Sequence, residues 1–112
     1  MKASLGQLLA RLPRPPTEKW PDGEPFVTAF GHGTMSVEVF APRGTDHQQP
    51  HSQDELYFIM SGHAGFAREG RRSDVSLGDA LFVPAGERHH FEDISNDFIA
   101  WVVFWGPNDG ER

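Results

Sequence analysis

Residues 47–62 read HQQPHSQDELYFIMSG and decide how the rest of the chain is interpreted. The stretch begins with His47 and His51, reaches the carboxylate of Glu55 and continues as the apolar run 56–60. Side chains of like parity share one face of an extended strand, so these two histidines and the glutamate are expected to point the same way. Burying such groups unpaired costs roughly 2–7 kcal/mol each. A divalent cation would satisfy all of them, so the stretch predicts a metal site.

The composition limits what the protein can be. A chain of 112 residues is the size of one domain with one core. With 16 acidic and 10 basic residues the net charge is −6, which argues against binding to nucleic acid or to an anionic membrane. The chain has no cysteine, which excludes disulfides, a thiol nucleophile and thiolate ligands. Any metal must therefore be held by nitrogen and oxygen.

No apolar run approaches the ~20 residues that span a bilayer, and the N-terminus lacks the apolar core of a secretory signal. We therefore expect a cytoplasmic protein. The 12 glycines and 9 prolines, together with 9 phenylalanines, favour many short strands joined by tight turns.

The chain divides into three segments. Residues 1–25 form an N-terminal helix, predicted over 4–12 from a leucine stripe that ends at a proline, and an extended proline-rich connector that Trp20 packs against the domain. Residues 26–105 form an all-β domain, and residues 106–112 a tail. Besides the run 56–60, strands are predicted at 26–30, 34–40, 64–68, 73–77, 80–83, 88–92 and 97–105. The last of these is apolar on both faces, as is typical of a central strand.

A second informative segment is 78–93, GDALFVPAGERHHFED. A short buried strand, a tight turn and a further strand follow one another here, and the further strand carries His89 and His90. Adjacent residues of a strand point to opposite faces, so only one of the two histidines can share a cavity with the first stretch.

The two segments together resemble the paired motifs of the cupin superfamily. The first motif is a His-x-His pair, a glutamate and, after six intervening residues, a glycine, and it fits with the first histidine of the pair replaced by Gln49. The second motif fits at four positions, with its final asparagine replaced by Asp93. The matching residues are His51, Glu55 and Gly62 in the first motif, and Gly78, Pro84, Gly86 and His89 in the second.

The resemblance, to small single-domain cupins of the type 2 conserved-barrel class, implies a single antiparallel jelly-roll β-barrel with the metal inside. The implied ligands are His51, Glu55 and His89, with Gln49 in the remaining ligand position. His47 competes with Gln49 but would need a bulge to reach the metal. Two imidazoles and one carboxylate are typical of non-haem iron(II) sites, so Fe(II) is favoured, with Mn, Ni, Zn or Cu as alternatives.

Further residues follow from strand parity. Tyr57 and Phe91 lie two positions beyond the glutamate and the second-motif histidine, so both are expected to line the cavity, and Trp101 is expected to contribute. Glu55 is the candidate catalytic residue because a carboxylate can move a proton, and a spare histidine is the alternative. His90 is expected to face away from the cavity.

These observations favour a metal-dependent enzyme, dioxygenase-like or polyketide-cyclase-like, acting on a small organic or aromatic metabolite. The alternatives are a small-ligand binding or sensor barrel without chemistry, and a purely structural dimeric barrel. A homodimer is expected because a small barrel leaves strand edges that need covering.

Overall fold

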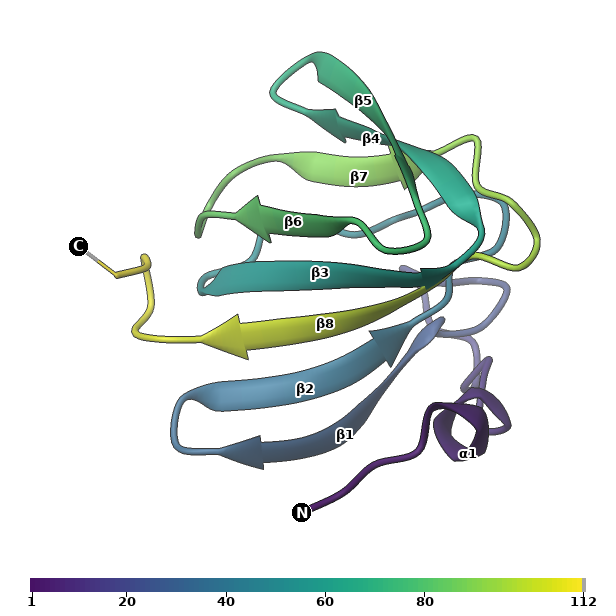
Figure 1. The fold of residues 1–112 in the computed structure, drawn as a ribbon, viewed down its shortest axis with the longest axis horizontal. Helices are drawn as coiled ribbons and strands as arrows, with labels where there is room; N and C mark the ends of the chain where they lie inside the picture. Colours follow the sequence, from purple (N-terminus) through teal and green to yellow (C-terminus); the bar gives the residue numbers. More distant parts are fainter. Residues whose placement is uncertain (112) are drawn as a thin grey trace.

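The computed structural model of the protein describes residues 1–111 and consists mainly of antiparallel strands in two sheets (Figure 1). One sheet has five strands in the order β1-β2-β8-β3-β6, and the other has three in the order β5-β4-β7. Arg112, the last residue of the predicted tail, lies outside the described residues. The elements are α1 (Leu5–Leu9), β1 (Phe26–His32), β2 (Met35–Phe40), β3 (Asp54–Ser61), β4 (His63–Arg68), β5 (Arg71–Ser76), β6 (Ala80–Val83), β7 (His89–Glu92) and β8 (Ile99–Trp105).

The predicted all-β fold with a short N-terminal helix is confirmed, and every predicted strand is present. β8 lies between β2 and β3, so the prediction of a central last strand is also confirmed. The β4–β5 hairpin is tighter than predicted, because Glu69 and Gly70, with φ of 46° and 78°, form a two-residue turn by themselves. Strand β5 therefore already begins at Arg71, within the stretch 69–72 that we expected to be the turn.

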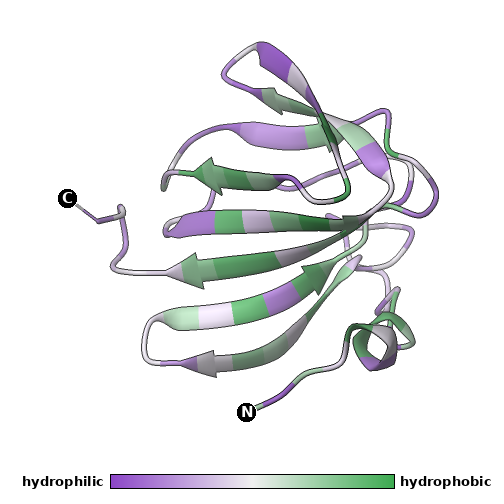
Figure 2. Ribbon diagram, in the orientation of Figure 1, coloured by the Kyte–Doolittle hydropathy of each residue, from purple (hydrophilic) through white to green (hydrophobic). Residues whose placement is uncertain are grey.

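The core lies between the two sheets. Its largest side chains are aromatic, and the ring of Phe91 packs against Tyr57, Phe66 and Phe98 at centroid distances of 4.9 to 5.1 Å. Figure 2 shows the hydrophobic residues concentrated along β3, β6 and β8, and hydrophilic residues on much of β5, at the outer edge of the small sheet. No helix in the described part of the chain is long and apolar enough to cross a membrane.

The connector folds differently from the extended segment that we predicted. Arg14 and Glu24 pair through their backbones, so the chain between them forms a closed loop. Trp20 lies in this loop and is 6% exposed, because its indole joins the core, as expected. Burial of this large ring favours a loop over an extended chain, and the loop forms part of the wall of the cavity described below.

Candidate metal centre

The structure brings together the three residues that the paired motifs predicted as ligands. His51 lies in the loop before β3, Glu55 lies on β3, and His89 begins β7 of the smaller sheet. One nitrogen or oxygen atom from each lies within 4.8 Å of the others. Because the donors come from both sheets, the cluster forms only when the two sheets pack together.

The carboxylate of Glu55 lies at the centre of the cluster and is 1% exposed. Its Oε1 lies 2.7 Å from Nε2 of His89, and its Oε2 lies 3.9 Å from Nε2 of His51. Although the first distance is short, neither oxygen accepts a hydrogen bond of acceptable geometry within residues 1–111. A buried carboxylate without such hydrogen bonds is strongly disfavoured. A cation between the three side chains would satisfy both oxygens, so the residues present fit a metal ion.

The ring of His89 is oriented for ligation. Its Nδ1 lies 2.8 Å from the carbonyl oxygen of Glu87, which accepts the Nδ1 proton and leaves the Nε2 lone pair directed at Glu55. Burial lowers the pKa of His89, but the carboxylate of Glu55, 2.7 Å from its Nε2, more than offsets this and raises the pKa overall. Burial lowers the pKa of His51 by more than the charge of Glu55 raises it. Without a metal, His89 is therefore the more basic of the two imidazoles.

A glutamine also faces the cluster, but it is Gln48 rather than the predicted Gln49. The side chain of Gln49 is exposed. The Nε2 group of Gln48 donates to the buried carboxylate of Asp46, which directs its Oε1 inward, where it lies 3.3 Å from Nε2 of His51. Strand β3 begins only at Asp54, so the alternation of side chains from which Gln49 was predicted does not extend back to position 49. No pattern in the sequence distinguishes the two glutamines.

Two other histidines lie outside the cluster. His47, the competitor for the remaining ligand position, packs edge-on against Trp20 with ring centroids 5.3 Å apart. His90 is exposed and lies 3.3 Å from a carboxylate oxygen of Glu92, so it faces away from the cavity, as strand parity predicted.

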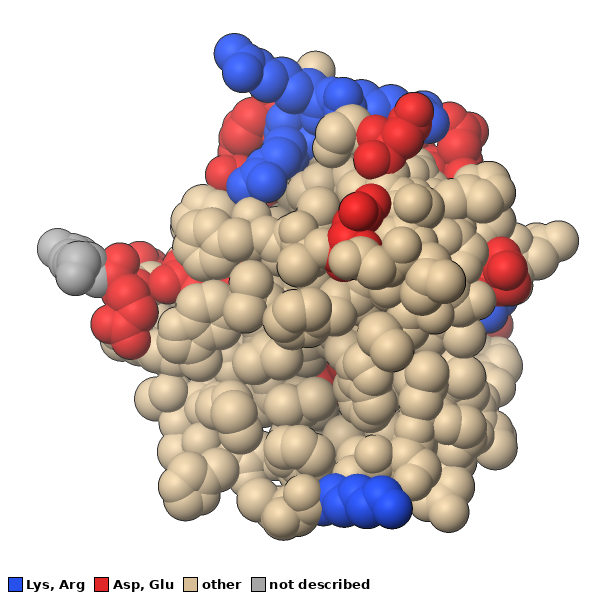
Figure 3. All heavy atoms as spheres, in the orientation of Figure 1, with Lys and Arg blue, Asp and Glu red and all other residues tan. Residues whose placement is uncertain are grey.

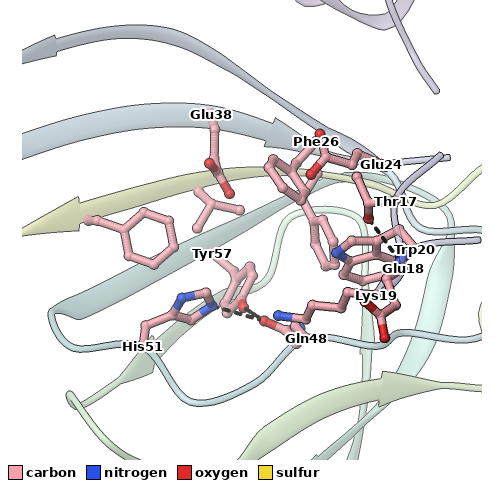
Figure 4. A pocket seen from close by; sticks show the side chains of 13 residues that line it. Thr17, Glu18, Lys19, Trp20, Glu24, Phe26, Glu38, Gln48, His51 and Tyr57 are labelled. Atoms are coloured by element: carbon pink, nitrogen blue, oxygen red, sulfur yellow. Dashed lines mark hydrogen bonds between the residues drawn. The ribbon is translucent and has the colours of Figure 1, made fainter. Parts of the chain in front are cut away.

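A cavity of about 520 Å³ adjoins the cluster, and Tyr57 lines it as predicted (Figure 4). The Tyr57 hydroxyl donates to Oε1 of Gln48 over 2.9 Å and lies 3.0 Å from Nε2 of His89. Phe91, which was also predicted to line the cavity, is not among the lining residues, because it packs at 90° against the Tyr57 ring behind this wall. The lining residues are Thr17, Glu18, Lys19, Trp20, Glu24, Phe26, Glu38, Phe40, Gln48, His51, Tyr57, Val102 and Phe104.

The prediction that Trp101 lines the cavity is not met. On β8 it is Val102 that pairs with Tyr57 of β3 and faces inward. Trp101 has the opposite parity and packs on the outer side of the sheet with Val39 and the residues around α1.

Sequence reasoning missed Glu38, which lies on β2 and lines the cavity. Burial, assisted by the negative charge of Glu55, raises the pKa of this carboxyl group from 4.5 to about 7. The sequence did contain a signal for this residue. Glu38 lies two positions before the core residue Phe40 on the same strand, so both side chains point to the same face of the sheet.

Comparisons with known proteins agree with this architecture. A sequence model described as the cupin domain matches residues 36–105. An uncharacterized protein of Streptomyces coelicolor is 43% identical over 75 residues, which cover 65% of this chain and 71% of that protein. The dimethylsulfoniopropionate lyase of Ruegeria pomeroyi is 32% identical over 89 residues, covering 76% of this chain and 42% of the lyase. The acireductone dioxygenase of Bacillus mycoides is 48% identical over 46 residues, covering 37% and 27%.

Solved structures show the same fold. A cupin 2 conserved barrel domain protein from Salinispora arenicola superposes with a TM-score of 0.63 at 19% identity, covering 72% of this chain and 74% of that one. The Ruegeria lyase superposes with a TM-score of 0.61 at 27% identity, covering 72% and 46%. The predicted cupin-type barrel is thereby confirmed. The chain spans less than half the length of the lyase.

Removal of a single donor should abolish metal binding. Protein purified without added metal should contain about one divalent ion per chain by mass spectrometry. We expect the His51→Ala and Glu55→Ala variants to contain less than about a tenth of that amount, because each loses one of three ligands. The matched control is His47→Ala, which should keep its metal. Retention of metal by either ligand variant, with the fold verified by circular dichroism, would contradict the assignment.

The raised pKa of Glu38 should appear as pH-dependent stability. Between about pH 4.5 and 7 the unfolded chain releases the Glu38 proton while the folded protein keeps it, so stability falls as the pH rises and stays lower above pH 7. Glu38→Gln cannot ionise and should be about 1–3 kcal/mol more stable than the wild type at pH 8, since the group is partly screened by solvent.

Urea unfolding of metal-free protein at pH 5 and pH 8 measures this difference, which should largely vanish at pH 5. Glu92→Gln, the same change at a half-buried glutamate that already pairs with Arg72, serves as control and should show no such gain. Equal stability of the wild type and Glu38→Gln at pH 8 would contradict the assignment of a raised pKa.

Proposed function

The chain belongs to the cupin domain family, and from that premise we propose that it is a metal-dependent enzyme acting on a small organic molecule held in the barrel cavity. The observation that carries this proposal is the buried carboxylate of Glu55, which lies between His51 and His89 and has no hydrogen bond of acceptable geometry among the described residues. The cluster opens onto a cavity of about 520 Å³, which is of the size that small ligands occupy.

The proposed metal is a divalent ion held by His51, Glu55 and His89. Two imidazoles and one carboxylate match the ligand set of non-haem iron(II) oxygenases, so iron(II) is favoured, and Mn, Ni, Zn and Cu remain alternatives. A metal in this position would act as a Lewis acid toward a substrate oxygen and, as iron, would support chemistry with dioxygen. Gln48 is the candidate for the remaining ligand position, because Asp46 holds its amide with the oxygen facing His51.

Tyr57 is the candidate for positioning substrate beside the metal. Burial first, and then the negative charge of Glu55, raise the pKa of its hydroxyl well above the ordinary value. The hydroxyl therefore stays protonated, and a substrate oxygen that replaces Oε1 of Gln48 as its acceptor would receive its hydrogen bond. Glu55 is the candidate catalytic residue, because its oxygens lie next to both imidazoles and a carboxylate there can accept a proton.

Two relatives with named activities support different reaction types. The acireductone dioxygenase has the higher sequence identity, but its match is confined to 46 residues. The match to the lyase has lower identity and extends over 89 residues. We place a dioxygenase-like reaction first, because the ligand set suits iron(II), and a lyase-type reaction second, because the Ruegeria enzyme matches more of the chain. A polyketide-cyclase-like reaction would use the same metal without consuming dioxygen.

We also propose that two copies associate through the outer face of the five-stranded sheet. Figure 3 shows that the centre of this face, over β2, β8 and β3, is almost free of charged side chains. Its exposed apolar residues include Phe58, Met60 and Phe82, which are 40%, 40% and 49% exposed. A second copy suits this face because two uncharged apolar surfaces can pack together although each chain carries a net charge of −6.

Turnover should depend on the metal. Protein loaded with iron(II) without oxygen, then exposed to air with a panel of phenols and diketones, should take up dioxygen with at least one compound. Glu55→Ala and His89→Ala should lower the rate about 100-fold or more, because metal and substrate are no longer held together. His47→Ala is the control that keeps activity. Dimethylsulfoniopropionate, followed by NMR without oxygen, tests the lyase alternative.

If the metal-loaded protein converts no compound with any of the proposed metals, while ligands still raise its melting temperature, the enzyme proposal fails. A binding barrel without chemistry would then account for the cavity.

Light scattering tests the association of two copies. The wild type should have a mass of about 25 kDa, twice the 12.5 kDa of one chain. Phe58→Lys should lower this to the mass of one chain with the fold retained, because it places a charge in the centre of the apolar face. Glu92→Lys, a comparable change on the other sheet, should remain dimeric. A monomeric wild type would contradict the proposal.

A further inference from the structure

The wall of the cavity opposite His51 carries a carboxyl group. Figure 4 shows Glu38 entering the cavity from β2 with Phe26 beside it, whereas His51 and Gln48 lie on the other side. A molecule bound in the cavity would therefore lie between the metal cluster and Glu38. The reaction described above assigns no role to this side chain.

The carboxyl group of Glu38 has no partner within the described residues. No side chain or backbone group there donates a hydrogen bond to it or forms an ion pair with it. Its neighbours in the cavity wall are apolar, among them Phe26, Phe40 and Val102. Burial among them raises its pKa to about 7, which is the response expected of a carboxylate that lacks a compensating charge. A ligand with a positive charge would supply that compensation.

Three aromatic rings line the same cavity, and one of them, Phe26, lies beside Glu38. Trp20 meets Phe26 at a centroid distance of 6.3 Å and Phe40 at 6.4 Å, both nearly perpendicular. Aromatic faces attract cations, and rings grouped in this way recognise alkylammonium groups. The Trp20 ring already has a cation near it, since the Nζ atom of Lys19 lies 6.0 Å from its centroid.

The charges around the cavity act in the same direction. Two further carboxylates, of Glu18 and Glu24, line the cavity in addition to Glu38, and that of Glu24 also lies 3.9 Å from the guanidinium of Arg14. Lys19 is the one lysine or arginine among the described lining residues. The cavity therefore favours a cationic molecule over an anionic one.

We propose that Glu38 and the rings of Trp20, Phe26 and Phe40 bind a cationic group of the ligand, of the alkylammonium type, while the opposite end of the ligand faces the metal cluster. This inference rests on the proposed function, because it takes the cavity to be the ligand site. It adds the chemical class of the ligand, a small molecule with a positive charge, and the residue that selects it.

A matched pair of probes isolates the effect of the charge. Choline and 3,3-dimethylbutan-1-ol have nearly the same shape and differ in having a positively charged nitrogen or a neutral carbon at the branched end. Binding of each to zinc-loaded protein is measured by ligand-detected NMR. The wild type should bind choline about tenfold or more tightly than the neutral alcohol. In Glu38→Gln this ratio should fall to about two or less, whereas Glu38→Asp should retain most of it.

Glu92→Gln is the control for removal of one carboxylate from the protein and should keep the wild-type ratio. Equal affinity of the two probes for the wild type would overturn the inference, and so would failure of both to bind. A Glu38→Gln variant that weakens both probes alike would also overturn it, because the side chain would then only shape the cavity. None of these results affects the metal-dependent turnover assay, so the two proposals fail separately.

Discussion

The carboxylate of Glu55 is 1% exposed, and neither of its oxygens accepts a hydrogen bond of acceptable geometry within residues 1–111. The rest of the site is arranged around this constraint. A loop brings His51 to one oxygen, and the smaller sheet brings His89 to the other. The same packing of two sheets that buries the core therefore also assembles the donors, and a bound cation should stabilise the folded barrel as well as equip it for chemistry.

Local sequence patterns were sufficient to predict most of the fold. Alternation of apolar residues and the spacing of turns located every strand, and the paired motifs identified the three clustered donors although His89 lies 34 positions beyond Glu55. The alternation of side chains along a strand gave a wrong prediction before Asp54, where the backbone is a loop. There Gln48 rather than Gln49 faces the cluster. The sequence did not show which residues of β8 face the cavity, because the run is apolar on both faces. Trp101 was therefore assigned to the wrong side.

Different walls of the cavity carry different chemistry. His51 and the Tyr57 hydroxyl lie on one side, and Glu38 lies on the opposite side with Phe26 beside it. The connector contributes Trp20 to the cavity wall, so a segment outside the barrel shapes the site. Such a division, with reactive groups at one end and recognition groups at the other, is how binding energy from a remote part of a substrate can position its reacting part.

The most direct measurement of the central claim is X-ray absorption spectroscopy at the metal edge of protein loaded with one equivalent of iron(II) or zinc. The account predicts nitrogen and oxygen ligands alone, at about 2.0–2.2 Å for zinc, with scattering from two imidazole rings that falls to one ring in His51→Ala reloaded at high metal concentration. A spectrum without imidazole scattering, or one unchanged in His51→Ala, would contradict it, because the ion would then lie elsewhere and Glu55 would remain a carboxylate paired only with His89.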